Sequence, residues 1–210
     1  MIKPILFNTQ MVQEILESRK TTTRRIIKTG SDFNLIGICS KDGSKFDYAS
    51  FGYGNIEDVS HVEIKDRVKA PYLPGDILYV RETWLAHSRG LNTLAFKYKA
   101  DGTVNDIVSF TKERFNKFYK FADQEKWQPS LFMPKEAARI FLRVKNVKIE
   151  RLQDITEDGI RAEGITEEFP PHARDKFQEL WDSTTKEYRW RLNPWVWVIE
   201  FERCEKPNEI

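Results

Sequence analysis

The sequence predicts a mixed α+β fold in which a few short helices surround a small, partly closed β-barrel. Its candidate strands are separated mostly by turns or by irregular stretches, and they do not alternate regularly with helices. The longest candidate strand spans residues 140–149, and its apolar positions change phase at Asn146, from Val144 before it to Val147 after it. A one-residue phase change indicates a bulge or bend, which a sheet needs in order to curve and close.

Length and composition are those of one globular domain. The 210 residues, 40% hydrophobic and 31% charged, suffice for a single domain over 1–210 with insertions at about 30–70 and 86–130. The net charge of +2 gives no global attraction to nucleic acid or membrane. No apolar run approaches the ~20 residues that cross a bilayer, and the N-terminus is too short and polar for a signal peptide. We therefore expect a cytoplasmic protein without a membrane partner.

Cysteine and histidine residues are few and scattered, at Cys39, Cys204, His61, His87 and His172. No pair has the close spacing of a zinc site. We expect two free thiols in a reducing compartment, with no metal and no cofactor.

The N-terminal elements follow from periodicity and from a basic stretch. Residues 2–7 should form a strand, and a helix capped by Asn8 or Thr9 should follow, because apolar residues recur at Met11, Val12, Ile15 and Leu16. The β-branched run Thr21–Thr23 favours a second strand, so that Lys20 lies near a helix-to-strand junction. Junctions can present side chains to a cleft, whereas the alternative is a solvated basic helix end.

The first insertion and the strand after it are predicted from turn sequences. Residues 30–70 should contain one or two weak strands, with turns at 41–44 and 51–54. A buried strand is expected at 77–84. Arg81 and Glu82 interrupt it, either as members of a salt bridge or as a charged site at the mouth of the barrel.

The second insertion, 86–130, should contain an edge strand at 95–100 and one helix. The aromatic spacing in that helix, at Phe115, Phe118 and Tyr119, is more typical of a core face than of a stacking platform. One helical turn is expected at 134–138, with Pro134 in its first position.

The C-terminal part should hold two helices and a closing strand. The first helix is capped by Thr156 and ends at Glu163 and Gly164. The second carries an apolar face at Phe177, Leu180 and Trp181. Residues 193–202 alternate as a strand with one apolar face, formed by Trp195, Trp197, Ile199 and Phe201.

Four of these segments together resemble the ASCH domain: Arg19–Arg25, Pro74–Trp84, Leu152–Glu157 with Ala162–Ile165, and Trp197–Phe201. The resemblance covers both ends of the chain and the middle strand, and it implies a PUA-like β-barrel. The longer form is similar to ASCH proteins common in bacteriophages and prophages.

The resemblance also implies an activity, because some small bacterial ASCH proteins are amidohydrolases that deacetylate N4-acetylcytidine. Lys20, Thr23 and Arg25 match their Arg-Lys-Thr-x-Thr-x-Arg motif, and Glu163 matches the glutamate after the later helix. By this resemblance Thr23 is the nucleophile, Lys20 the proton acceptor and Glu163 the proton donor. Departures are the doubled length, Ser18 in place of glycine, and Arg24 in place of an apolar residue.

Elementary chemistry is compatible with these roles. Amide hydrolysis needs a nucleophile, a base and an acid for the leaving amine. The arginines around Lys20 favour its neutral form, which is the form that can act as a base. Glu163 would lie at a helix C-terminus, where the dipole disfavours an anion, although an exposed glutamate without function is the alternative.

Three functional hypotheses remain open from the sequence. The first is a metal-free amidohydrolase for an N4-acylated cytosine nucleoside, with a cleft lined by Arg25, Arg81, Glu82 and Trp84. The second is a non-catalytic module that binds RNA or a modified nucleotide. The third is a phage accessory protein that acts through protein contacts. The oligomeric state and the choice between free nucleoside and RNA as substrate stay open.

Overall fold

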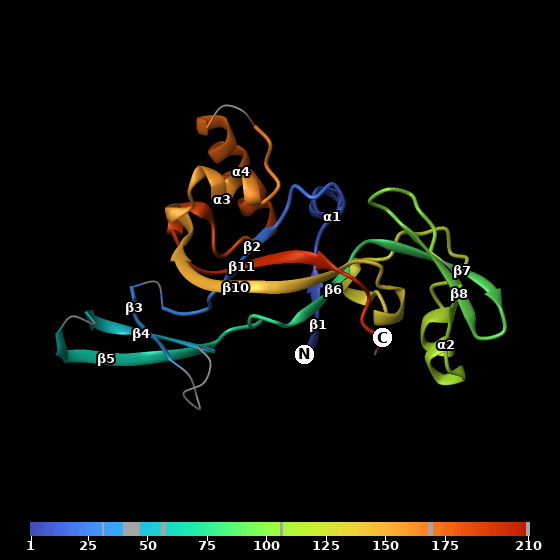
Figure 1. The fold of residues 1–210 in the computed structure, drawn as a ribbon, viewed down its shortest axis with the longest axis horizontal. Helices are drawn as coiled ribbons and strands as arrows, with labels where there is room; N and C mark the ends of the chain where they lie inside the picture. Colours follow the sequence, from blue (N-terminus) through green and yellow to red (C-terminus); the bar gives the residue numbers. More distant parts are fainter. Residues whose placement is uncertain (31, 40–46, 56–57, 106, 168–169, 209–210) are drawn as a thin grey trace. The chain divides into compact units, whose positions relative to one another are not determined.

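The computed structural model of the chain describes residues 1–30, 32–39, 47–55, 58–105, 107–167 and 170–208 (Figure 1). Within these ranges the protein is a mixed α+β structure, mostly strands with a few short helices, which confirms the predicted class. No helix in the described ranges is both long and apolar enough to cross a membrane.

The α-helices are α1 (Thr9–Leu16), α2 (Lys112–Tyr119), α3 (Glu157–Ala162) and α4 (Pro170–Thr184). The strands are β1 (Ile2–Leu6), β2 (Thr22–Ile26), β3 (Asn34–Cys39), β4 (Tyr48–Asn55), β5 (Asp58–Lys69), β6 (Ile77–Arg81), β7 (Trp84–Gly90), β8 (Thr93–Tyr98), β9 (Val108–Ser109), β10 (Phe141–Arg151) and β11 (Trp195–Cys204). Short 3₁₀ turns are η1 (Ser130–Phe132), η2 (Lys135–Ala137), η3 (Leu152–Asp154) and η4 (Trp190–Leu192).

The strands form three sheets, with the orders β1-β6-β10-β11-β2, β3-β4-β5 and β7-β8-β9. Strand β1 runs parallel to β6, and the other described pairs run antiparallel. None of these orders returns to its first strand, so no sheet is closed over the described part of the chain. The α+β class is therefore confirmed, and the small, partly closed PUA-like barrel stays a prediction.

The chain divides into two compact units. Unit 1 comprises residues 1–21, 75–143 and 201–210, and unit 2 comprises residues 22–74 and 144–200. Each unit has its own hydrophobic cluster, and each is described here by itself.

Unit 1 begins as the sequence predicts. Strand β1 is followed by α1, and the Asn8 side chain accepts a hydrogen bond from the Met11 amide at 2.8 Å, as an N-cap does. The predicted strand 77–84 is interrupted, because β6 ends at Arg81 and β7 starts at Trp84. The predicted single helical turn at 134–138 is the 3₁₀ turn η2, with Pro134 as its N-cap residue rather than inside it.

The second insertion forms its own three-stranded sheet, with α2 beside it (Figure 1). The strand expected at 95–100 is β8, which pairs with β7 along its length and with β9 only at Thr93 and Leu94. Apolar and polar residues alternate in β8 because one face of the strand packs on the aromatic cluster of unit 1. Phe118 of α2 is buried in that cluster, whereas Tyr119 is 52% exposed.

Tyr98 gives unit 1 a testable alkaline pH dependence. Its hydroxyl donates to the Ala137 carbonyl at 2.5 Å, and burial raises the pKa of Tyr98 above its ordinary value, with a further rise from the Glu82 charge. The unfolded chain therefore loses this proton first as pH rises past the ordinary value of 10.0, and stability falls. At neutral pH we expect Tyr98→Phe to be less stable than the wild type by about 1 kcal/mol. As the pH rises, the free energy of unfolding should fall less in Tyr98→Phe than in the wild type, because the variant lacks this titrating group.

Urea unfolding of both proteins at neutral pH and above the ordinary tyrosine pKa measures this difference. Equal losses of stability with rising pH in Tyr98→Phe and wild type would rule out a contribution from Tyr98.

In unit 2, the first insertion is more regular than predicted. It forms the three-stranded sheet β3-β4-β5, in which β5 alone has 12 residues, so the expectation of one or two weak strands is wrong. The turn expected at 41–44 lies outside the described residues, and the turn expected at 51–54 is wrong, because these residues lie within β4. A Cβ on Gly52 would lie 1.9 Å from the Glu63 carbonyl oxygen. The absence of a side chain here therefore lets β4 and β5 come close together where their register shifts.

The core of unit 2 joins α3 and α4 to one face of β11 and β2 (Figure 1). Phe177 and Trp181 of α4 are buried there, as the helical spacing predicts. The predicted one-sided strand 193–202 is wrong in its middle, because Val196 and Val198 are buried in the same cluster. This strand is apolar on both faces where it passes between β10 and β2.

Candidate functional site

The basic motif begins where α1 ends in unit 1. Ser18 has a φ of 61°, in the left-handed region, where glycine is favoured. The Arg19 and Lys20 amides then both donate to the Glu14 carbonyl, at 2.9 and 3.0 Å, which turns the chain away from the helix. The helix-to-strand junction at Lys20 is therefore as predicted.

Lys20 is buried, with only 2% of its surface exposed. Its ammonium nitrogen lies 5.8 Å from the centre of the Phe7 ring, which in turn contacts Phe201 at 6.2 Å between centres. The alternative of a solvated helix end is thus wrong for this residue. A lysine is seldom buried in a protein, because the charged ammonium loses its hydration there.

In unit 2 the motif continues as β2, which pairs with β11 in the register Thr23 opposite Ile199 and Arg24 opposite Val198. Side chains of a strand alternate between faces, so Thr23 and Arg25 share one face and Arg24 lies on the other. Thr23 and Arg24 are both buried.

Arg24 joins two carboxylates inside unit 2. Its guanidinium donates to Glu163 at 3.0 Å and to one oxygen of Glu150 at 2.7 and 2.9 Å. It also lies over the Phe177 ring, 5.9 Å from the centre. Gly159 leaves room for the guanidinium, because a Cβ there would lie 3.0 Å from one of its nitrogens.

Glu163 lies at the end of α3, from where its carboxylate contacts Arg24. The Thr156 hydroxyl accepts from the Gly159 amide at 3.1 Å, Glu163 is the C-cap, and Gly164 follows with a φ of 95°, all as predicted. Glu163 is 5% exposed, so the alternative of an exposed glutamate is wrong. Its ion pair with Arg24 is therefore almost entirely removed from solvent.

Arg25 belongs to the same electrostatic environment. Burial lowers the pKa of Arg25 from its ordinary value, while the charges of Tyr72 and Glu163 oppose this change. The structure of unit 2 thus brings Glu163 near both arginines of β2, Arg24 and Arg25.

The other predicted cleft residues lie in unit 1. Glu82 is 1% exposed and receives hydrogen bonds from Arg139 at 2.8 and 2.9 Å. Burial raises the pKa of Glu82, although Arg139 opposes this rise. Trp84 is fully buried in the aromatic cluster, and its indole donates to the Pro129 carbonyl at 3.3 Å. Both residues are accounted for by structural contacts, and substrate binding by them stays a prediction.

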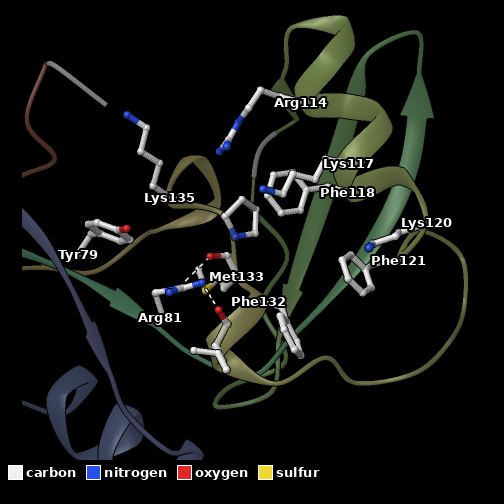
Figure 2. A pocket seen from close by; sticks show the side chains of 12 residues that line it. Tyr79, Arg81, Arg114, Lys117, Phe118, Lys120, Phe121, Phe132, Met133 and Lys135 are labelled. Atoms are coloured by element: carbon white, nitrogen blue, oxygen red, sulfur yellow. Dashed lines mark hydrogen bonds between the residues drawn. The ribbon is translucent and has the colours of Figure 1, made fainter.

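Arg81, in contrast, lines a pocket of unit 1 with a volume of about 410 Å³ (Figure 2). Its guanidinium donates to the carbonyls of Met133 and Leu131. The rest of the pocket comes from Tyr79 of β6, from α2 and the residues just after it, and from the chain around η1 and η2. It contains four further cations and four aromatic rings. The sequence reasoning missed this site, although lysines or arginines recur every three residues from Arg114 to Lys120.

Over the part of the chain that the structure describes, no group of three or more His, Cys, Asp or Glu side chains is placed to hold a metal ion. Comparisons with protein-family models, with curated proteins and with solved structures find no match to this chain.

Proposed function

We propose that the protein is an amidohydrolase that removes an acyl group from an N4-acylated cytosine nucleoside, on an ASCH-type, PUA-like fold. The observation that supports this proposal most is the burial of the motif. Lys20, Thr23, Arg24 and Glu163 are all buried, and none of the four is more than 7% exposed. Burial of several charged groups costs free energy, and such groups are concentrated at functional sites.

The proposed reaction uses three of these residues. Lys20, as the neutral amine, takes the proton of the Thr23 hydroxyl while the threonine oxygen bonds to the acyl carbon. The bond from that carbon to the cytosine nitrogen then breaks, and the leaving amine receives a proton from Glu163, which the proton taken up by Lys20 replaces. Water then hydrolyses the acyl ester and restores Thr23.

Two features of unit 2 support a contribution of Arg25 to substrate binding. It shares a face of β2 with Thr23, and burial already lowers its pKa, which indicates incomplete hydration of the guanidinium. A guanidinium on the same face as Thr23 could donate to an oxygen of a substrate that is bound there.

Incubation of the purified chain with N4-acetylcytidine, followed by chromatography, tests the proposal. We expect the wild type to form cytidine and acetate, and Lys20→Met to be slower by at least about 10²-fold because the base is removed. Lys28→Met is the matched control, since Lys28 is exposed two residues after β2. A folded wild type that leaves N4-acetylcytidine and its longer-chain acyl analogues unchanged would overturn the proposal in favour of a non-catalytic module.

A further inference from the structure

The pocket of unit 1 has a composition that the proposed reaction does not explain. Its described lining contains five lysines or arginines and four aromatic residues, and none of the described lining residues is acidic. Residues 112–135 contain six lysines and arginines against three acidic residues, which is a local excess in a chain whose net charge is only +2. A local positive field of this kind attracts polyanions.

The arginines of the pocket are held by the protein itself. Arg114 forms a bidentate pair with Glu136, with both oxygens at 2.7 Å from one guanidinium nitrogen. Arg81 is held by the carbonyls described above. These two residues therefore fix the shape of the pocket more than they offer charge to a ligand.

Three lysines supply the charge that is available to a ligand. Lys117, Lys120 and Lys135 are exposed, line the pocket, and form no ion pair with a carboxylate among the described residues. Lys117 lies in the last turn of α2, Lys120 is the C-cap, and Lys135 lies in η2. Figure 2 shows lysine side chains reaching the pocket from both α2 and η2. Contacts from two elements suit a chain of phosphates better than a single anion.

Two aromatic rings, those of Phe121 and Phe132, line the pocket together with these lysines. Phe132 is 50% exposed, and its ring is nearly parallel to that of Phe121, at 18° and 6.3 Å between centres. The Lys120 ammonium lies 5.0 Å from the centre of the Phe121 ring. A half-exposed ring next to cations can hold a base by stacking, whatever the base, since each has a π-face.

We propose that this pocket binds a single-stranded nucleic acid, with phosphates at Lys117, Lys120 and Lys135 and a base stacked on Phe132. An acidic peptide would satisfy the lysines but would not require the exposed ring. The proposal is independent of the amidohydrolase, because it concerns only unit 1 and a ligand that need not carry an acyl group.

The test compares two fluorescein-labelled oligomers of about twelve nucleotides, oligothymidylate and an abasic strand of equal length, by fluorescence anisotropy at about 50 mM salt. We expect the full-length wild type to bind oligothymidylate about tenfold more tightly than the abasic strand. Lys117→Gln with Lys120→Gln should weaken both probes and reduce the salt slope by about 1.4, from two lost phosphate contacts. Phe132→Ala should weaken oligothymidylate alone, by about tenfold.

Matched controls come from the same segment. Lys112→Gln with Lys126→Gln makes the same change in charge at exposed lysines that do not line the pocket. Tyr119→Ala removes a 52% exposed ring of α2 that does not line it either. Both controls should bind as the wild type does.

Three results would overturn the proposal. The first is no binding of oligothymidylate by the folded wild type at the lower salt concentration. The second is equal weakening by the control and pocket variants, which would indicate a diffuse charge effect. The third is equal affinity for oligothymidylate and for the abasic strand, which would exclude a stacked base from the pocket.

Discussion

Replacing Thr23 with valine should lower the turnover of N4-acetylcytidine by at least about 10³-fold, because it removes the proposed nucleophile. Replacing it with serine should keep turnover within about tenfold of the wild type, since a hydroxyl remains. Thr23 is 3% exposed and pairs with Ile199 within the ladder between β2 and β11. Valine is the appropriate replacement because it keeps the β-branched shape that suits this strand.

The measurement is steady-state formation of cytidine by both variants, with their urea unfolding midpoints as the control for folding. A folded valine variant that still converts the substrate at the wild-type rate would remove Thr23 from the reaction. Loss of activity in the serine variant alone would also contradict the assignment, because serine retains the reacting group.

Replacing Arg24 with methionine should destabilise the protein by about 3–5 kcal/mol. The side chain of Arg24 is 3% exposed and that of Glu163 4%, so the variant would leave a buried carboxylate without its cation. Glu150, 18% exposed, would lose the same partner. The large effect arises from the charge left behind, because removing one member of a buried pair costs more than the pair contributes.

Two comparisons separate this explanation from a general effect of losing an arginine. Arg161→Met removes a 58% exposed partner of Asp158, and it should cost at most about 1 kcal/mol. Adding Glu163→Leu to Arg24→Met should recover part of the lost stability, since that buried charge is then absent. Urea denaturation gives the free energy of unfolding of the wild type, of the two single variants and of the double variant. A loss of under about 1 kcal/mol in Arg24→Met would contradict the buried pair.

Short-range features were predictable from the sequence because they depend on neighbouring residues. The cap at Asn8, the cap at Thr156 and the glycine after Glu163 each involve groups within a few positions of one another. The same holds for the junction at Lys20, where a helix ends before a β-branched run. Local propensity and capping therefore sufficed for β1, α1 and α3.

The first insertion could not be predicted well because its strands stabilise one another. Strand β5 is polar along much of its length, and its 12 residues are held by pairing with β4. The glycines of β4 look like turn residues in the sequence, yet Gly52 permits two strands to approach at a register shift. A strand is recognised in a sequence by the alternation of apolar and polar residues that one buried face produces, and β5 has no buried face among its described side chains.

By itself, the sequence determined the α+β class, the basic motif, and the local frame that carries Lys20, Thr23 and Glu163. Only the tertiary structure decided the environment of these charges. Arg24 lies 126 positions from Glu150 and 139 from Glu163, and no spacing rule connects residues so far apart. The tertiary structure likewise brings three lysines and the Phe132 ring to one pocket of unit 1. The physical reason is that burial and ion pairing depend on which surfaces meet when the chain folds, whereas caps and periodicity act within a few residues.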